Sequence, residues 1–206
     1  EYLNLDPLMI FEKGGATTGA KIYNLIERIL REKTGIRHIT FAQLYQITKV
    51  HFIVVGSSLA RKVAVYYDHI SHPNFKVSLA IRISFGVPVV FTPINVDGDF
   101  QLDGAVCDSY PIEIFKEDMD RTIGILTYET FSTDFNNVLE YLFALAMLAL
   151  DQHFRRAREL YPENTIQIGD NNSTSVTTGR IDNKDKEILY LAGVEAAERF
   201  ICQLDV

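Results

Sequence analysis

Two Asp-Gly pairs follow each other in the middle of the chain, and their surroundings give them different predicted roles. Asp97-Gly98 separates two strand-forming runs, VVFTPINV and DFQL, where glycine supplies the positive φ of a tight hairpin. Asp103-Gly104 follows the second run, so we expect its carboxylate to project from a strand end into a loop, where catalytic groups are commonly displayed. Such a carboxylate can act as a general base. Asp-Gly is mainly turn chemistry, however, so the second pair alone does not decide between catalysis and a turn.

A longer pattern surrounds Asp103. The segments AIRISFGVPVVFTPI (80–94) and LDGAVCDSYPI (102–112) resemble the helix and strand, A-x-R-x-S-x-x-x-P-x-x-F-x-P-[VI], and the loop, [VL]-D-G-[GA]-x-x-x-N-x-P-[IV], of patatin-like phospholipases and acyl hydrolases of viral or bacterial type. Ala105 replaces the commoner second Gly, and Ser109 stands where Asn is frequent. Flanking segments resemble the family too, so the resemblance covers most of the chain. The matching residues are Arg82, Ser84, Pro88, Phe91, Pro93, Asp103, Gly104, Pro111 and Ile112.

The resemblance implies a fold and a reaction. The fold would be α/β, a three-layer arrangement of a sheet flanked by helices. The reaction would be phospholipase A-type ester hydrolysis in lipid degradation, by a Ser–Asp dyad without metal or organic cofactor. Asp103 would be the base, Gly104 and Ala105 would position the loop, and Arg82 would support it. The partner would be a phospholipid or another acyl ester, with transient contact to a membrane surface.

The nucleophile of this dyad is the open question, because the sequence has no G-x-S-x-G elbow. Ser58 stands in a G-x-S-x-A outline, but an elbow needs a following helix, and RKVAVYY reads as a strand. Ser84 belongs to the matched helix, where packing is the better interpretation. The glycines of Lys13 to Ala16 precede a helix and could bind an anion, although an ordinary loop and cap is the better interpretation.

In the family, the serine elbow and the oxyanion loop precede the region where this chain starts. We therefore expect the chain to be the C-terminal portion of a longer hydrolase, with a sheet incomplete at its N-terminal side, and an enzyme only as part of that whole. The alternatives are a catalytically inactive relative that binds lipid or protein, and an assembly module in which Asp103 merely ends a hairpin.

Composition bounds these interpretations. The 206 residues, 47% of them hydrophobic, suffice for a single domain over 1–206. A net charge of −7 argues against nucleic acid as a partner. The longest apolar run, 138–150, is shorter than the roughly 20 residues of a membrane span. Cys107 and Cys202 do not suggest a disulfide framework, which favours a cytoplasmic location or one peripheral to a membrane.

No metal site is expected, because the histidines form no ligand pattern; they are His38, His51, His69, His72 and His153. Arg155, Arg156 and Arg158 form a basic cluster that could favour lipid headgroups, although a solvated helix end is the better interpretation.

Periodicity and capping signals predict a mixed order of helices and strands. A helix capped by Thr17 or Thr18 should end at Gly35, and a capping box at Thr40–Gln43 should begin a second helix. Further helices are expected at 76–84, about 134–160 and 183–203, and a surface loop at 169–180. Strands are expected at 51–55 and 62–67, around a turn at Gly56–Ser58, and at 88–95, 99–102, 121–127 and 164–168.

Overall fold

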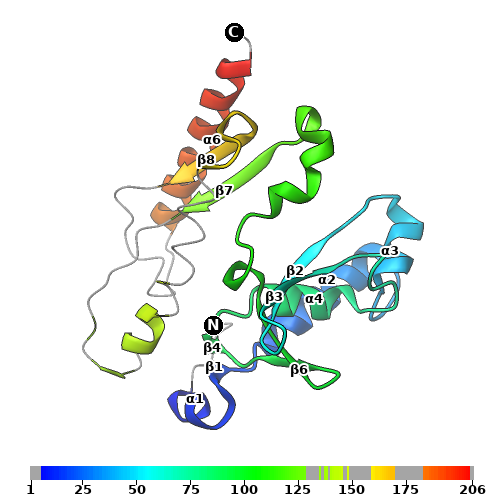
Figure 1. The fold of residues 1–206 in the computed structure, drawn as a ribbon, viewed down its shortest axis with the longest axis vertical. Helices are drawn as coiled ribbons and strands as arrows, with labels where there is room; N and C mark the ends of the chain where they lie inside the picture. The colour runs from blue at the N-terminus through cyan, green and yellow to red at the C-terminus, as the bar shows by residue number, and fades with distance from the viewer. Residues whose placement is uncertain are drawn as a thin grey trace. The chain divides into compact units, whose positions relative to one another are not determined.

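The computed structural model describes residues 6–128, 135, 137–138, 140–145, 148, 159–169 and 183–204. Helices and strands are interspersed along the chain, and the strands lie in several sheets (Figure 1). The predicted α/β class is confirmed. Contacts divide the chain into one compact unit of Glu1–Ser109 with Phe135–His153 and a second of Tyr110–Asp134 with Phe154–Val206. We describe each unit by itself, and the single domain over 1–206 stays a prediction.

The first unit holds a four-stranded antiparallel sheet in the order β3-β2-β6-β5. Its strands are β2 (Val54–Ser58), β3 (Val63–Tyr67), β5 (Ile94–Val96) and β6 (Asp99–Asp103). A separate parallel pair joins β1 (Gly15–Thr17) to β4 (Val89–Phe91). The strand expected over 88–95 is therefore split into two short strands that belong to different sheets. The break falls at Thr92-Pro93, and proline lacks the N–H that a continuing ladder would use.

The Asp97-Gly98 turn between β5 and β6 is confirmed. Val96 pairs with Asp99, and both turn residues have positive φ, 52° at Asp97 and 89° at Gly98. Positive φ at both central positions is the geometry of the hairpin turn that Asp-Gly favours.

The turn expected at Gly56–Ser58 is wrong. These three residues lie in β2, paired with β3 on one side and with β6 on the other, and the chain reverses afterwards, over 59–62. Gly56 is required by packing, since a Cβ there would come within 2.7 Å of the Ile83 side chain. Ser57 and Ser58 are buried, and their hydroxyls make the hydrogen bonds that let polar side chains occupy the interior.

The helices of the first unit are α1 (Pro7–Lys13), α2 (Ala20–Thr34), α3 (Phe41–Thr48) and α4 (Val77–Ser84). The capping box of α3 is confirmed. The backbone N–H of Gln43 donates to the Thr40 hydroxyl at 3.3 Å, and the backbone N–H of Thr40 donates to the Gln43 side-chain oxygen at 3.0 Å. The N-cap of α2 is Gly19 rather than either threonine, and Gly35 ends the helix in a left-handed conformation as predicted. α1 had no sequence prediction.

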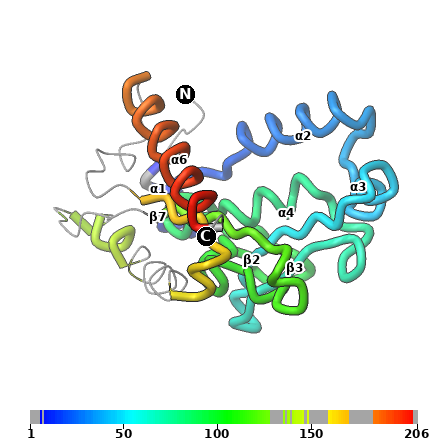
Figure 2. Tube along the Cα trace, turned by 90° about the horizontal axis from the view of Figure 1, so that it is seen from above, coloured from blue at the N-terminus to red at the C-terminus, as the bar shows by residue number. Residues whose placement is uncertain are grey.

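The core of the first unit forms where α4 packs on β2. α4 also contacts α2, and the two helices run beside each other in the Cα trace (Figure 2). Burying such apolar side chains contributes roughly 1.5–3 kcal/mol each, before opposing entropic costs. The buried hydrophobic residues of this core are Ile39, Phe41, Val54, Val65, Tyr67, Val77, Ala80 and Ile83.

The second unit pairs β7 (Gly124–Tyr128) with β8 (Thr165–Gly169) in parallel, and α6 (Asn183–Leu204) contacts β8. A kinked run of 3-10 turns, η2 (Pro111–Arg121), leads into β7. Shorter 3-10 turns are η1 (Gly104–Val106) in the first unit and η3 (Pro162–Asn164) in the second. Tyr110, Ile112 and Leu126 form a small core, in which the Tyr110 hydroxyl lies 2.7 Å from that of Thr165.

The helix predicted at 183–203 is confirmed by α6. Of the helix expected over about 134–160, residues 140–145 are helical, and much of the rest lies outside the described residues. The expected loop lies outside them from 170 onward. Among the helices of the described ranges, none combines the length and apolar character needed to cross a membrane.

Candidate active site

Asp103 is the last residue of β6 and turns its carboxylate into the start of a loop. The backbone N–H of Asp103 donates to the Gly86 carbonyl at 3.2 Å, which ties the strand end to the chain that leaves α4. Its carboxylate accepts one hydrogen bond, from the Ala105 N–H at 2.9 Å. The residue is 8% exposed. The structure thus places a nearly buried carboxylate at a strand end, where the sequence predicted it.

Burial gives this carboxylate an unusual acidity. Loss of solvation raises the pKa of Asp103 from 3.8 to about 6, and the hydrogen bond from Ala105 opposes the rise. Desolvation disfavours the charged form of an acid. A carboxyl group whose pKa lies close to neutrality is a better general base than an ordinary aspartate, while it is still mostly ionised at pH 7. Strongly perturbed groups of this kind are common at active sites.

The two loop positions named from the sequence lie beside Asp103 and shape its turn. Gly104 and Ala105 begin the 3-10 turn η1. A Cβ on Gly104 would lie 2.4 Å from the Val55 carbonyl oxygen, so only glycine lets the loop approach β2 this closely. The Ala105 N–H holds the carboxylate by a local side-chain turn typical of aspartate.

Ser57 also belongs to this site, although the sequence assigned it no role. It lies in β2 and is 1% exposed. Its hydroxyl is 2.7 Å from the Asp103 carbonyl oxygen and 3.2 Å from that of Gly104, and it accepts the Cys107 N–H at 3.1 Å. One buried side chain therefore fastens both ends of the turn to the sheet. The sequence carried no signal beyond a serine that follows an apolar run and one glycine.

A second hydrogen bond attaches the end of the same loop to the sheet. The Tyr66 hydroxyl, from β3, donates to the Asp108 carboxylate at 2.6 Å. The segment 103–108 is thereby attached to two neighbouring strands. A loop anchored in this way keeps a functional side chain in one orientation, as a preorganised site requires.

Arg82 lies in α4 and is 2% exposed. Its hydrogen-bond partners lie outside the Asp103 loop. Its Nε and Nη2 donate to the carbonyls of Thr18 and Thr92, each at 2.9 Å, which follow β1 and β4. The guanidinium also lies over the rings of Phe85 and Phe91. Burial lowers its pKa, although arginine stays charged in proteins. Arg82 therefore joins two strand ends, and within the described chain its guanidinium has no carboxylate partner.

Comparison with known proteins adds a distant relationship. No family model matches the chain. The chain is 28% identical over 205 residues to an uncharacterised protein of Acanthamoeba polyphaga mimivirus, covering 95% of this chain and 68% of that protein. It is 25% identical over 150 residues to a protein named probable lipid hydrolase of Invertebrate iridescent virus 6, covering 68% of this chain and 51% of that protein. The chain thus spans about half the length of a relative that carries the name of a lipid hydrolase.

The other serines have structural settings. Ser58 is 2% exposed and donates to the Asp99 carboxylate at 2.6 Å; a turn and β3 follow it rather than a helix, so it is not on an elbow. Ser84 is the last residue of α4. The glycines at 14 and 15 form no anion-binding helix start, because Gly14 ends α1 and Gly15 begins β1.

Histidines form no metal centre in the part of the chain that the structure describes. His51 contacts the Asp68 carboxylate at 3.0 Å, and His69 stacks on Tyr45 with centroids 3.8 Å apart. Both cysteines are free. His153 and the arginines at 155, 156 and 158 lie outside the described residues.

Proposed function

We propose that this chain carries the general base of a lipid acyl hydrolase, and that the base is Asp103. The substrate would be a phospholipid or another acyl ester, cleaved in phospholipase A fashion. The observation that carries the proposal is the carboxylate itself, 8% exposed at a strand end with its pKa raised to about 6 by burial. The iridescent-virus relative, named a probable lipid hydrolase, supports the same class of reaction.

In this mechanism Asp103 works directly on a serine, without an intervening histidine. As the serine oxygen attacks the ester carbonyl, Asp103 accepts the hydroxyl proton. It then gives that proton to the departing alcohol oxygen, which leaves an acyl-enzyme. Water enters next and loses a proton to Asp103 as it attacks the acyl carbonyl, and the serine recovers its proton when the fatty acid departs. The same carboxylate is thus base and acid in turn.

The serine of this dyad would come from a segment that is not among these 206 residues. Three serines of the first unit do not fit the role: Ser57 and Ser58 are buried in β2 with hydrogen-bond partners, and Ser84 ends a helix. Both relatives are longer than the stretch they share with this chain. Backbone donors for the oxyanion would come from the same additional segment.

The test is ester hydrolysis and fluorophosphonate labelling of the complete protein, with two Asp-to-Asn variants compared. Asp103→Asn removes the base, so we expect the loss of both hydrolysis and labelling. Asp97→Asn is the matched control, because it lies in an exposed Asp-Gly hairpin with φ of 52°, a conformation that Asn also tolerates. The control should keep wild-type turnover. Wild-type turnover in Asp103→Asn would refute the proposed base, and a wild-type protein that neither labels nor hydrolyses esters would favour a binding module.

A further inference from the structure

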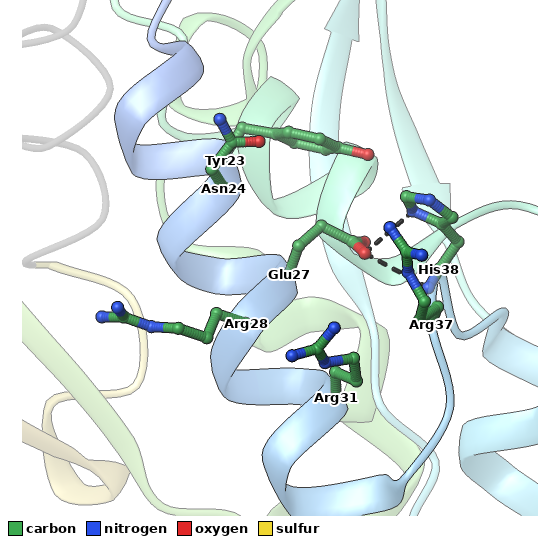
Figure 3. A pocket seen from close by; sticks show the side chains of 7 residues that line it. All are labelled: Tyr23, Asn24, Glu27, Arg28, Arg31, Arg37 and His38. Atoms are coloured by element: carbon green, nitrogen blue, oxygen red, sulfur yellow. Dashed lines mark hydrogen bonds and ion pairs between the residues drawn. The ribbon is translucent and has the colours of Figure 1, made fainter.

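A pocket lies between α2 and the loop that follows it (Figure 3). Its volume is about 280 Å³, close to the lower limit of about 300 Å³ for small-molecule sites. Arg28 and Arg31 stand three residues apart on α2, a spacing that makes residues neighbours on a helix surface. Gly35 ends the helix in a left-handed conformation, and this reversal brings Arg37 and His38 back along the last turns. Three arginines thereby line one hollow of a protein whose net charge is −7.

The wall of this pocket is fixed by Glu27. Its carboxylate accepts the backbone N–H of His38 at 3.2 Å and lies 2.8 Å from the His38 ring nitrogen, and the Ser78 hydroxyl of α4 donates to its other oxygen. The Glu27 side chain is 14% exposed. His38 has φ of 53°, which is uncommon for a residue other than glycine and is often found where a structure serves a function. The loop that carries Arg37 is therefore held in one conformation.

The arginines beside this wall are free to bind a ligand. Both oxygens of Glu27 face His38 and Ser78, and within the described residues Glu27 makes no ion pair with an arginine. Neither the Arg31 guanidinium nor the Arg37 guanidinium has an ion-pair or hydrogen-bond partner within the described ranges. In Figure 3 the Arg37 side chain lies beside Glu27 and His38, and Arg31 lies next along the helix from Glu27. Arg28 extends away from His38. Arg28 has only a loose, exposed contact with Glu32, at 4.0 Å, and such surface pairs contribute little.

We propose that this pocket binds a phosphate group, with Arg31 and Arg37 as its principal ligands. The planar fork of arginine matches phosphate oxygens and forms paired, charge-assisted hydrogen bonds. The Tyr23 hydroxyl lines the same pocket and supplies a neutral donor. The phosphate is that of a monoester or diester, and its source is either a phospholipid headgroup or a soluble phosphate compound. This site is separate from Asp103 and does not depend on ester hydrolysis.

Binding is measured on the complete protein at low ionic strength, because exposed charges are screened strongly by salt. The first probe is inorganic phosphate, whose binding is measured by calorimetry. The second is vesicles of phosphatidylcholine with and without phosphatidic acid, whose binding is measured by sedimentation. The test variant is Arg31→Gln with Arg37→Gln. The control is Lys13→Gln with Lys33→Gln, which removes the same charge from exposed positions outside the pocket. All proteins also carry Asp103→Asn, so that no hydrolysis alters the vesicles.

We expect the arginine variant to lose affinity about tenfold or more, as removal of two charge-assisted contacts implies, and the lysine variant to bind like the parent. Binding to phosphatidic acid vesicles that inorganic phosphate competes away would identify a lipid headgroup. Binding of inorganic phosphate without vesicle binding would identify a soluble compound. Absence of phosphate binding in the parent, or equal losses in both variants, would overturn the proposal. Neither result bears on Asp103 as a base, which the hydrolysis assay tests separately.

Discussion

The hydroxyl of Ser57 lies 2.7 Å from the carbonyl oxygen of Asp103, and both residues are nearly inaccessible to solvent, at 1% and 8% exposure. The contact joins two strands of one sheet at the point where β6 becomes a loop. It fixes the backbone of the residue whose carboxylate we propose as the base, and the same hydroxyl accepts the Cys107 N–H. We therefore infer that Ser57 is a positioning residue, which acts through the backbone of Asp103.

Substitution of this serine should reveal the positioning role. Ser57→Ala leaves the Cys107 N–H without its partner, and loss of such a buried hydrogen bond should reduce the free energy of unfolding by about 1–3 kcal/mol. A loosened turn would admit water to Asp103 and bring its pKa down toward the ordinary value. The acidic limb of the pH–rate profile for ester hydrolysis should therefore move to lower pH.

Ser58→Ala is the matched control for this prediction. Ser58 is the next residue of β2, equally buried, but its hydroxyl bonds Asp99 rather than the Asp103 loop. Denaturant unfolding should show a similar loss of stability in both variants, while the pH–rate profile should shift only in Ser57→Ala. Identical pH–rate profiles in the two variants would show that Ser57 contributes only to stability.

The raised pKa of Asp103 also makes a prediction about stability. The folded protein holds this proton more tightly than the unfolded chain, with a pKa of about 6 against 3.8. The wild type should therefore lose stability as pH rises from about 4 to 6, by at most about 3 kcal/mol at equilibrium. Asp103→Asn removes the free-energy cost of ionising this buried carboxyl group. We expect the variant to gain stability relative to wild type as pH increases through this window.

Urea unfolding at pH 4, 5, 6 and 8 checks this difference. Asp97→Asn serves again as the control, since its side chain is exposed and lies in the β5–β6 hairpin, outside the Asp103 loop. A difference between Asp103→Asn and wild type that does not change between pH 4 and 8 would show that the Asp103 carboxyl is not desolvated.

Gly104 should be intolerant of a methyl group. In Gly104→Ala the new Cβ would collide with the Val55 backbone, 2.4 Å from its oxygen, and relief of the clash must move the Asp103 loop away from β2. Overpacking of this kind costs roughly 1–3 kcal/mol, and we expect hydrolysis to fall strongly. The measurements are urea unfolding and ester turnover.

Gly98→Ala separates steric displacement from general loss of stability. Its Cβ would meet nothing within 4 Å, although the φ of 89° is unfavourable for alanine. The strain should cost about 1–2 kcal/mol without displacing Asp103. If both alanine variants lost turnover to the same degree, close approach at Gly104 would not be the cause.

Arg82→Lys should destabilise the first unit despite the retained charge. A single ammonium on a flexible stem cannot reproduce the two contacts of the guanidinium with Thr18 and Thr92, so one buried carbonyl would lose its donor. We expect the free energy of unfolding to fall by about 2–3 kcal/mol. Arg61→Lys, at a side chain 60% exposed, should change it by less than about 0.5 kcal/mol. Equal effects in the two variants would contradict a bridging role for Arg82.

Local chemistry made much of this fold predictable from sequence. The Thr40–Gln43 capping box, the Gly35 helix end and the Asp97-Gly98 hairpin each depend on contacts within a few residues. Signals that short survive without knowledge of the tertiary structure. The same holds for Asp103 at a strand end, because strand and loop composition change abruptly at that position.

The failures of prediction lie where distant segments meet. Gly56–Ser58 has the composition of a turn, and only pairing with both β3 and β6 makes it a strand. The partners of Arg82 are likewise remote along the chain, because its guanidinium donates to two carbonyls that follow β1 and β4. These partners are far away along the chain, so a local sequence pattern cannot predict them.

The sequence by itself thus determined the capping box of α3, the Asp97-Gly98 hairpin and the position of Asp103 at a strand end, since these follow from propensity and turn chemistry. Tertiary structure alone decided the environment of that carboxylate: its burial, the raised pKa, and the hold of Ser57 on its backbone. It also brought Arg37 back beside Arg31 at the end of α2. The physical reason is that solvation and hydrogen-bond partners depend on which segments are close in space, and spacing along the chain does not encode that.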